Sequence, residues 1–206
     1  MATLSDIRTT VARKVRDTTN ATWNTNELND AINQGIDAIG AFYPKDIVST
    51  FATVSAGVLS YPASSYSNIY RIEVYSGTTH MGDLSPSLGD GADSGWELHG
   101  GVIYLPPGYT VGAGYTLRAF GYGPYIQLAS DTSVTDLDTS GLFALYCYCR
   151  YELFSALTVD RAKYQQWQGD TNNTDTTTTA MVQLAAWAEA KWEREKQRLK
   201  KMRKLG

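Results

Sequence analysis

LFALYCYCRYELFSAL, residues 142–157, is the stretch that says most about the fold of this chain. At helical spacing its apolar side chains occupy two stripes on different sides of one helix. The first stripe consists of Leu142, Leu145, Tyr146, Cys149, Leu153, Ala156 and Leu157, and the second of Phe143, Cys147, Tyr151 and Phe154. Arg150 and Glu152 interrupt the run, and we expect them at the rim. Because a helix that is apolar nearly all round is usually buried in a bundle, we predict a long buried helix over residues 138–168.

The N-terminal residues 1–45 predict a helical hairpin that packs against this helix. Two sets of apolar residues repeat at spacings of three and four, as one face of a helix requires. They are Leu4, Ile7, Val11 and Val15 in the first helix, and Leu28, Ile32, Gly35, Ile36 and Ile39 in the second. Thr3 with Asp6, and Asn24 with Glu27, have the spacing of helix-capping pairs.

Between residues 46 and 130 the periodicity changes to the alternation of strands, and glycine, proline and tyrosine become frequent. The candidate strand segments are IVSTFATV (47–54), VLSYP (58–62), IYRIEVY (69–75), WELHGGVIYLP (96–106) and YTLRAFGY (115–122). Gly100-Gly101 predicts a two-residue hairpin turn, and Ala56-Gly57 a second one. Residues 76–95 are rich in turn formers and predict a long loop. We therefore expect an inserted antiparallel β-sandwich or barrel of five or six strands.

The C-terminal part of the chain divides into a polar run and a helix. Residues 169–180 contain GDTNNTDTTTT without a large apolar side chain, which predicts a flexible Thr-rich tether. Residues 181–206 consist mostly of strong helix formers and predict a C-terminal helix. The fold class expected from the whole chain is α+β: a helical bundle made from both ends of the chain, an inserted β module and a tethered C-terminal helix.

The C-terminal helix carries a charge that the rest of the chain does not share. Residues 181–206 contain eight Lys or Arg and three Glu, a net charge of +5. Since the whole chain has 18 basic and 21 acidic side chains, residues 1–180 hold ten and 18, a net charge of −8. The overall charge of −3 argues against general affinity for nucleic acid, so only this helix would supply it.

Apolar residues of the C-terminal helix recur at alternating spacings of four and three, a narrow seam interrupted only by Glu195. A seam with a central Trp192 is typical of a helix that docks in a groove of another protein. The predicted partner-binding residues are Met181, Ala185, Trp187, Ala188, Lys191, Trp192, Arg194, Arg198, Leu199, Lys201 and Met202. Two other interpretations stay open: the helix packs on its own bundle, or it binds phosphates of nucleic acid or of a membrane.

The reactive residues of the chain do not form a recognisable catalytic pattern. His80 and His99 lack partners at metal-ligand or triad spacing, and no phosphate-binding glycine motif is present. Cys147 and Cys149 are two residues apart in a helical pattern, so we expect buried thiols rather than a disulfide or a metal pair. Asp138 is a candidate N-cap of the long helix. We predict no enzyme activity, no cofactor, no metal and no membrane span.

Taken in order, these segments resemble the head-to-tail adaptor (connector) proteins of tailed bacteriophages. The resemblance rests on DIRTTVARKVRD (6–17), WNTNELNDAINQGIDAIGAFYP (23–44) and LFALYCYCRYELFSALTVDRAKYQQW (142–167). In such proteins Trp23, Glu27, Leu28 and Ile32 begin the second bundle helix, and Asp160, Arg161 and Tyr164 end the long one. The segment from YRIEVYSG to FGYGP is similar to the β module that larger adaptors carry.

This resemblance implies a structural protein of the virion neck, assembled in the bacterial host cytoplasm. It implies a homo-oligomeric ring, commonly a dodecamer, whose channel passes the genome without specific binding. The implied partners are the portal ring, gripped by the C-terminal arm, and the next neck or tail component. An acidic body of residues 1–180 suits a channel that repels DNA. Two alternatives remain: a carbohydrate- or ligand-binding β module with helical supports, and a DNA-binding protein that uses the basic helix.

Overall fold

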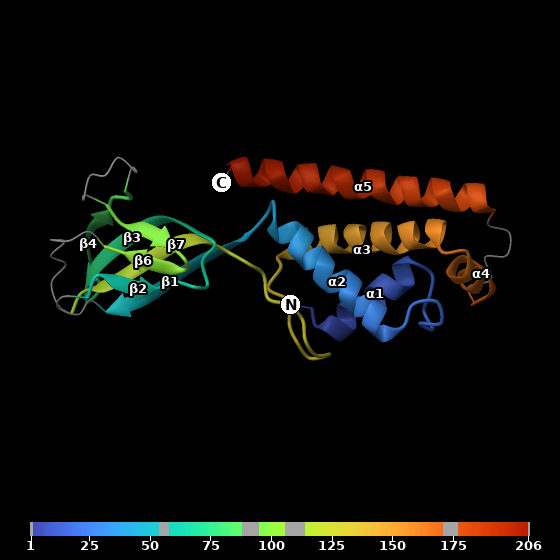
Figure 1. Cartoon of the computed structure of the whole chain (residues 1–206), viewed down its shortest axis with the longest axis horizontal. Coiled ribbons are helices and arrows are strands. Elements are labelled where there is room, and N and C mark those ends of the chain that lie inside the picture. Colours follow the sequence, from blue (N-terminus) through green and yellow to red (C-terminus); the bar gives the residue numbers. More distant parts are fainter. Residues whose placement is uncertain (1, 54–57, 88–94, 106–113, 171–176, 206) are drawn as a thin grey trace. The chain divides into compact units, whose positions relative to one another are not determined.

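The computed structural model describes residues 2–53, 58–87, 95–105, 114–170 and 177–205. The chain divides into two compact units, one formed by Met1–Tyr43 with Tyr125–Gly206 and the other by Pro44–Pro124. In these described ranges, the helices belong to the first unit and the two antiparallel sheets to the second, which confirms the α+β class (Figure 1). None of the helices described is both long and apolar enough to cross a membrane.

The N-terminal hairpin consists of α1 (Leu4–Lys14) and α2 (Thr25–Gly40). Both capping boxes are confirmed, because Thr3 and Asn24 accept from the backbone of Asp6 and Glu27, whose carboxylates accept from the cap N–H groups in return. Satisfying the free N–H groups of a first turn stabilises each helix by about 1 kcal/mol. The predicted apolar faces of α1 and α2 lie in one buried cluster.

The connection between α1 and α2 is organised by a buried carboxylate. Asp17 is 1 % exposed and accepts from the backbone N–H groups of Ala21, Thr22 and Trp23 at 2.9, 3.1 and 3.0 Å. These bonds satisfy three donors in a segment without helical hydrogen bonds, which would otherwise be costly to bury. The turn therefore holds Trp23, 1 % exposed, in the core at the entrance to α2.

Helix α3 (Thr139–Val159) is the centre of this unit, and Asp138 is its N-cap as expected, accepting from Gly141 at 2.6 Å. On one side it packs closely on α2: a Cβ added at Gly35 would lie 2.5 Å from Leu145 Cδ1 and 2.8 Å from Tyr148 Cδ1. Cys149 is buried there, and its thiol donates to the carbonyl of Ala31 at 3.7 Å.

The predicted helix over residues 138–168 is divided at Asp160, which has an extended backbone. Asp160 ends α3 and begins α4 (Arg161–Asp170), because its carboxylate accepts from the N–H of Lys163 at 3.0 Å. The turn allows α4 to fold back on the hairpin, where Trp167 is buried and donates to the carbonyl of Val15 at 2.9 Å. Sequence periodicity did not indicate this break, whereas the family resemblance placed the end of the long helix at Asp160, where α3 ends.

Helix α5 (Thr178–Leu205) runs alongside α3, on the side away from α2 (Figure 1). Half of the predicted tether, residues 171–176, lies outside the described residues. Of its ends, Gly169 and Asp170 belong to α4, and Thr178 to Ala180 belong to α5. The C-terminal helix is thus part of the bundle, and α3 is covered on both sides.

The β unit contains seven strands in the residues described, more than the five or six expected. They are β1 (Lys45–Thr53), β2 (Ser60–Pro62), β3 (Asn68–Ser76), β4 (Thr79–Leu84), β5 (Glu97–His99), β6 (Val102–Tyr104) and β7 (Thr116–Gly123). One sheet has the order β1-β7-β3-β4 and the other β2-β6-β5, with every pair antiparallel. One apolar cluster draws on both sheets and includes Ile72, Leu117 and Ile103.

The hairpin predicted at Gly100-Gly101 is confirmed. Leu98 pairs with Ile103 across it, and the two glycines have φ angles of 59° and 74°, which side chains with a Cβ rarely adopt. The second predicted turn, Ala56-Gly57, lies outside the described residues.

Two boundaries of the β module differ from expectation. The predicted loop over 76–95 contains β4, because the edge of β3 supplies hydrogen-bond partners that compensate for a segment with little strand pattern. The register shifts between Val74, which pairs with Gly82, and Tyr75, which pairs with His80, so Met81 is the extra residue of a bulge beside Gly82, whose φ is 147°. The module also ends at Pro124 rather than 130, since Leu128 is buried in the helical core.

Candidate partner-binding surface

The C-terminal helix has an inner face that belongs to the core of its own unit. Five of the eleven predicted partner-binding residues are at most 8 % exposed there: Met181, Ala185, Ala188, Trp192 and Leu199. The Trp192 ring packs edge-on against Tyr148 of α3, with 5.2 Å between centroids, and lies 5.8 Å from the ring of Phe42. The seam therefore performs the self-packing that the sequence left open, and these five side chains are not available to a partner while α5 stays in place.

The outer face of α5 carries the remaining predicted residues. Trp187 and Met202 are 49 % and 41 % exposed. Arg194 and Lys201 are exposed, Lys191 is half-buried, and none of these three has a salt bridge with another described residue. Trp and Met next to unpaired cations are typical of the centre and rim of protein interfaces.

Other cations of α5 are engaged along the helix. Arg198 Nε lies 2.6 Å from Glu195, and Lys196 Nζ lies 2.9 Å from Glu193. Each is an i,i+3 pair on a helix surface and contributes a few tenths of a kcal/mol. The Arg198 pair explains how the seam tolerates Glu195, the one acidic residue within it, because the cation beside it neutralises that carboxylate.

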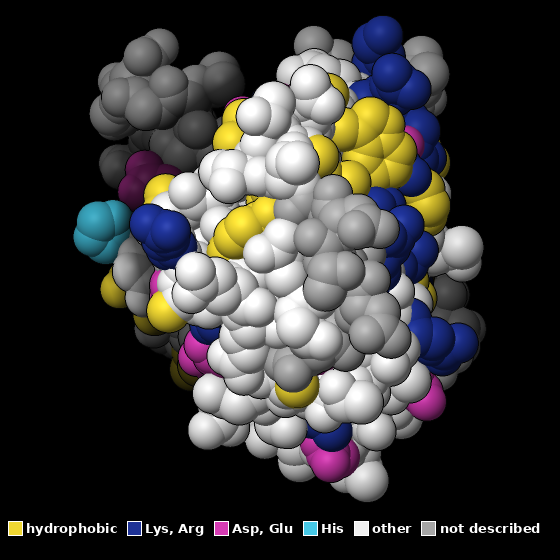
Figure 2. Space-filling view, turned by 90° about the vertical axis from the view of Figure 1, so that its right-hand side faces the viewer, with side chains coloured by type: hydrophobic (Ala, Val, Ile, Leu, Met, Phe, Trp, Pro, Cys, Tyr) yellow, Lys and Arg dark blue, Asp and Glu magenta, His cyan; other side chains and the backbone are white. Residues whose placement is uncertain are grey.

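In the end-on view of Figure 2, Lys and Arg side chains lie next to exposed hydrophobic groups along the right-hand border. Acidic side chains are scattered singly in this view. Cations beside apolar groups suit a partner that offers both carboxylates and an apolar surface, because such a partner satisfies both kinds of group at once.

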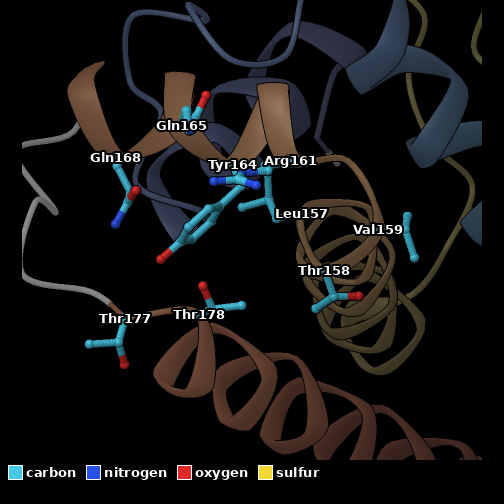
Figure 3. Close-up of a pocket in the computed structure, with 9 residues that line it drawn as sticks. All are labelled: Leu157, Thr158, Val159, Arg161, Tyr164, Gln165, Gln168, Thr177 and Thr178. Carbon is cyan, nitrogen blue, oxygen red and sulfur yellow. The ribbon is translucent and has the colours of Figure 1, made fainter.

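A pocket of about 740 Å³ lies where the end of α3, α4 and the start of α5 meet (Figure 3). Its lining consists of Leu157, Thr158, Val159, Arg161, Tyr164, Gln165, Gln168, Thr177 and Thr178. Among the described residues, the lining offers hydroxyl, amide and guanidinium groups, without a histidine, a cysteine or a carboxylate. The arrangement can hold polar ligands by hydrogen bonds.

His80, for which the sequence showed no partner at metal-ligand or triad spacing, is about half exposed and part of a small cluster in the β unit. Its Nε2 lies 2.9 Å from Asp83 Oδ1, and the ligand-type atoms of Glu73, His80 and Asp83 lie within 4.8 Å of one another. Glu73 is already engaged, because it pairs with Arg71 at 3.0 Å and accepts from Tyr75 at 2.8 Å. The nearby guanidinium disfavours a second cation at this place.

The ligand-binding alternative rested on exposed aromatic residues in the β unit. Trp96, the one tryptophan of this unit, is 5 % exposed and donates to the carbonyl of Leu84 at 3.0 Å. Tyr61 and Tyr66 are also buried, whereas Tyr70 and Tyr104 are about half exposed. Trp96, Tyr61 and Tyr66 therefore form core instead of a binding surface.

Sequence reasoning missed the surroundings of Arg150. Its guanidinium carbon lies 4.5 Å from the ring centroid of Trp187 and 5.3 Å from that of Phe154. The sequence did show Arg150 as a single cation inside an apolar helical run. Its partner Trp187 is 37 positions away, and their contact follows only from the packing of α5 on α3.

A comparison with protein families agrees with this architecture. The family model described as SU10 adaptor protein matches residues 2–198, a range that includes both units. A search of curated proteins finds no match. Because the match covers nearly the whole chain, the chain belongs to the SU10 adaptor protein family and is a structural adaptor protein of bacteriophages.

Proposed function

We propose that this adaptor forms the head-to-tail joint of the phage neck, where a ring of copies docks on the portal and receives the next neck or tail component. A twelvefold ring with a central channel for the genome fits this role. The observation that carries the proposal is the family match across both units. The ring is assembled in the host cytoplasm and ends in the virion neck.

In this proposal the outer face of α5 contacts the portal, through Trp187, Lys191, Arg194, Lys201 and Met202. Their exposure and unpaired charge support this assignment. The inner seam then holds the helix rigidly on α3, so that docking needs no ordering of the helix and loses less entropy. Arg198 lies at the border of the two faces and pairs with Glu195.

The charge distribution supports a passive channel. Residues 1–180 carry a net charge of −8, and the basic side chains that offset it are concentrated in the C-terminal helix. A wall with acidic excess repels the phosphate backbone and lets the genome pass without binding.

Co-sedimentation of the purified chain with portal rings of the same phage tests the proposal. We expect saturation at one copy per portal subunit and a ring in electron micrographs. Arg194→Glu combined with Lys201→Glu weakens binding by about tenfold or more, because each change places a like charge against the partner's complement. Arg13→Glu, at an exposed position on α1, is the control and leaves binding unchanged.

Portal rings that fail to bind the unaltered chain contradict the docking proposal. An equal loss in Arg13→Glu contradicts the assignment to α5, because it indicates a general charge effect. Binding of the chain to duplex DNA at physiological salt, with loss in the α5 variant, favours the nucleic-acid alternative instead.

A further inference from the structure

A shallow groove where α1, α3 and α5 meet collects cations and aromatic rings from three separate helices. Its lining consists of Lys14, Phe143, Tyr146, Cys147, Arg150, Ala188 and Lys191. We call it the cationic groove. Its free volume of about 20 Å³ admits one water-sized group, which matches a single carboxylate oxygen.

The three cations of the cationic groove face aromatic rings instead of carboxylates. Lys14 Nζ lies 5.3 Å from the Tyr146 centroid, and Lys191 Nζ lies 5.6 Å from that of Phe143. Trp187, at the edge of the groove, has the Arg150 guanidinium at 4.5 Å and Lys191 at 5.2 Å. A salt bridge to any of the three cations is absent from the described part of the chain.

Arg150 has an unused donor in this place. Its Nε is buried and has no hydrogen-bond partner among the described residues. Burial and the neighbouring charge of Arg16 both lower the pKa of its guanidinium. Leaving a charged donor without a hydrogen-bond partner costs free energy, and an arriving anion removes that cost.

The acidic groups nearest to the lining are occupied elsewhere. Glu195, whose charge acts on Cys147, pairs with Arg198 at 2.6 Å. Asp6, whose charge acts on Tyr146, belongs to the capping box of α1. Among the described residues, these two carboxylates therefore do not complete the groove, and an anion from another molecule is the source that we consider.

The geometry favours a protein carboxylate over a nucleic acid. Binding to DNA needs cations spread along a backbone track, whereas these three converge on a hollow for one oxygen. Phe143 and Trp187 are 40 % and 49 % exposed and offer apolar contact to the stem of an acidic side chain.

The most acidic loop among the described residues does not offer a free carboxylate, so a second copy of the chain is a poor source for this group. Asp131 pairs with Arg8 at 2.8 Å, Asp136 accepts from Ile126 at 3.3 Å, and Asp138 caps α3. Withdrawing any of them breaks a local contact. A partner protein with a free acidic segment incurs no such loss.

We propose that the cationic groove is the anchor point for an acidic segment of the neighbouring protein in the neck, with one Asp or Glu carboxylate seated between Arg150, Lys14 and Lys191. This inference rests on the proposed neck function and names the chemistry that the partner must offer. Trp187, against which Arg150 and Lys191 both lie, packs on the segment beside the carboxylate.

Fluorescence anisotropy of the full chain with a labelled peptide of alternating Asp and Glu tests this inference. An Asn/Gln peptide of the same length and a labelled deoxythymidine strand are the comparison probes. We expect the acidic peptide to bind, and Lys14→Gln or Lys191→Gln to weaken it about fivefold to tenfold, as loss of a charge-assisted contact does. Arg13→Gln removes the same charge one position from Lys14, outside the lining, and keeps full affinity.

We expect Arg150→Gln to give the largest loss of peptide affinity, provided that its thermal midpoint matches that of the parent chain. If this variant does not fold, the two Lys variants still decide the test. Equal weakening by Arg13→Gln, or equal binding of the Asn/Gln peptide, overturns the inference. Tighter binding of the deoxythymidine strand, lost in the same variants, overturns it in favour of nucleic acid.

Light scattering tests whether the chain self-associates. Self-association that the acidic peptide disrupts overturns the inference in favour of a second copy. Failure of the peptide test with intact portal binding removes the groove assignment alone. Failure of portal binding with intact peptide binding removes the docking partner and leaves the groove standing.

Discussion

Helices α3 and α5 lie side by side, yet they meet their surroundings in opposite ways. Helix α3 has 21 residues and is apolar on two sides, so that α2 covers one side and α5 the other. Helix α5 has 28 residues, with one apolar seam against α3 and an outer face of cations around Trp187. An apolar stripe therefore indicates that a helix face is buried, but it does not identify the element that packs on that face. On the side of the second stripe, Tyr148 packs on Trp192 of α5, whereas Phe154 packs on Trp167 of α4.

Removal of α5 has the largest expected effect on the stability of the helical unit. A chain ending at Thr177 exposes the side of α3 that α5 covers, including Tyr148, and loses the buried Trp192 and Leu199. Burial of several large side chains contributes about 2 kcal/mol each, so we expect a loss of roughly 5 kcal/mol or more, comparable to the whole stability of a domain. Urea unfolding monitored by circular dichroism measures it.

Adding a synthetic α5 peptide in trans is the control for that truncation, and it restores a cooperative transition. A truncated chain that unfolds with unchanged midpoint would show that α5 contributes nothing to the bundle.

Single tryptophan substitutions compare the two faces of α5 directly. Trp192→Ala removes a ring that is 5 % exposed and packs on Tyr148, and it lowers the free energy of unfolding by about 3–5 kcal/mol. Trp187→Ala, at 49 % exposure, lowers it by less than about 1 kcal/mol. Equal losses measured by urea unfolding would mean that the inner and outer faces are not distinct.

Gly35 tests the side of α3 that α2 covers. A methyl group at Gly35 meets Leu145 and Tyr148 at 2.5 and 2.8 Å, so Gly35→Ala costs about 1–3 kcal/mol through overpacking. Gly40→Ala is matched to it on the same helix, because its methyl group meets Tyr125 at an ordinary 3.7 Å. Similar unfolding midpoints for the two variants would contradict the close approach of α2 and α3.

The smallest expected effect concerns pH at the contact between α3 and α5. Burial raises the pKa of Tyr148 to about 12 from its usual 10, so the folded chain holds this proton after the unfolded chain has lost it. Stability is therefore complete below pH 10 and falls as pH rises toward 12. Tyr148→Phe removes this part of the slope in urea titrations across that range. An unchanged slope in the variant would show that Tyr148 titrates as it does in water.

Much of the fold was predictable because local chemistry specified it. The two capping boxes, the Asp138 cap and the Gly100-Gly101 turn each depend on neighbours within a few residues. By contrast, β4 depends on hydrogen bonds to β3, and the break at Asp160 depends on packing of Trp167 against α1. Such long-range contacts leave little trace in periodicity.

The candidate site was predictable in composition but not in arrangement. The seam and the cations of α5 were visible in the sequence. That the seam packs on α3 while the cations face outward follows only from the packing of the two helices. The cationic groove was not predictable, because its residues Lys14, Phe143 and Lys191 come from three helices. The positions of Arg150 and Lys191 against Trp187 likewise follow only from the three-dimensional packing.

Hydrogen exchange of the free chain tests the central claim most directly, since it measures whether α5 belongs to the bundle before any partner arrives. We predict that the amides around Trp192 and Leu199 exchange as slowly as those of α3, with protection near that of global unfolding. Rapid exchange throughout α5 in the free chain, with protection only on portal rings, would contradict the account and identify the helix as a free docking arm.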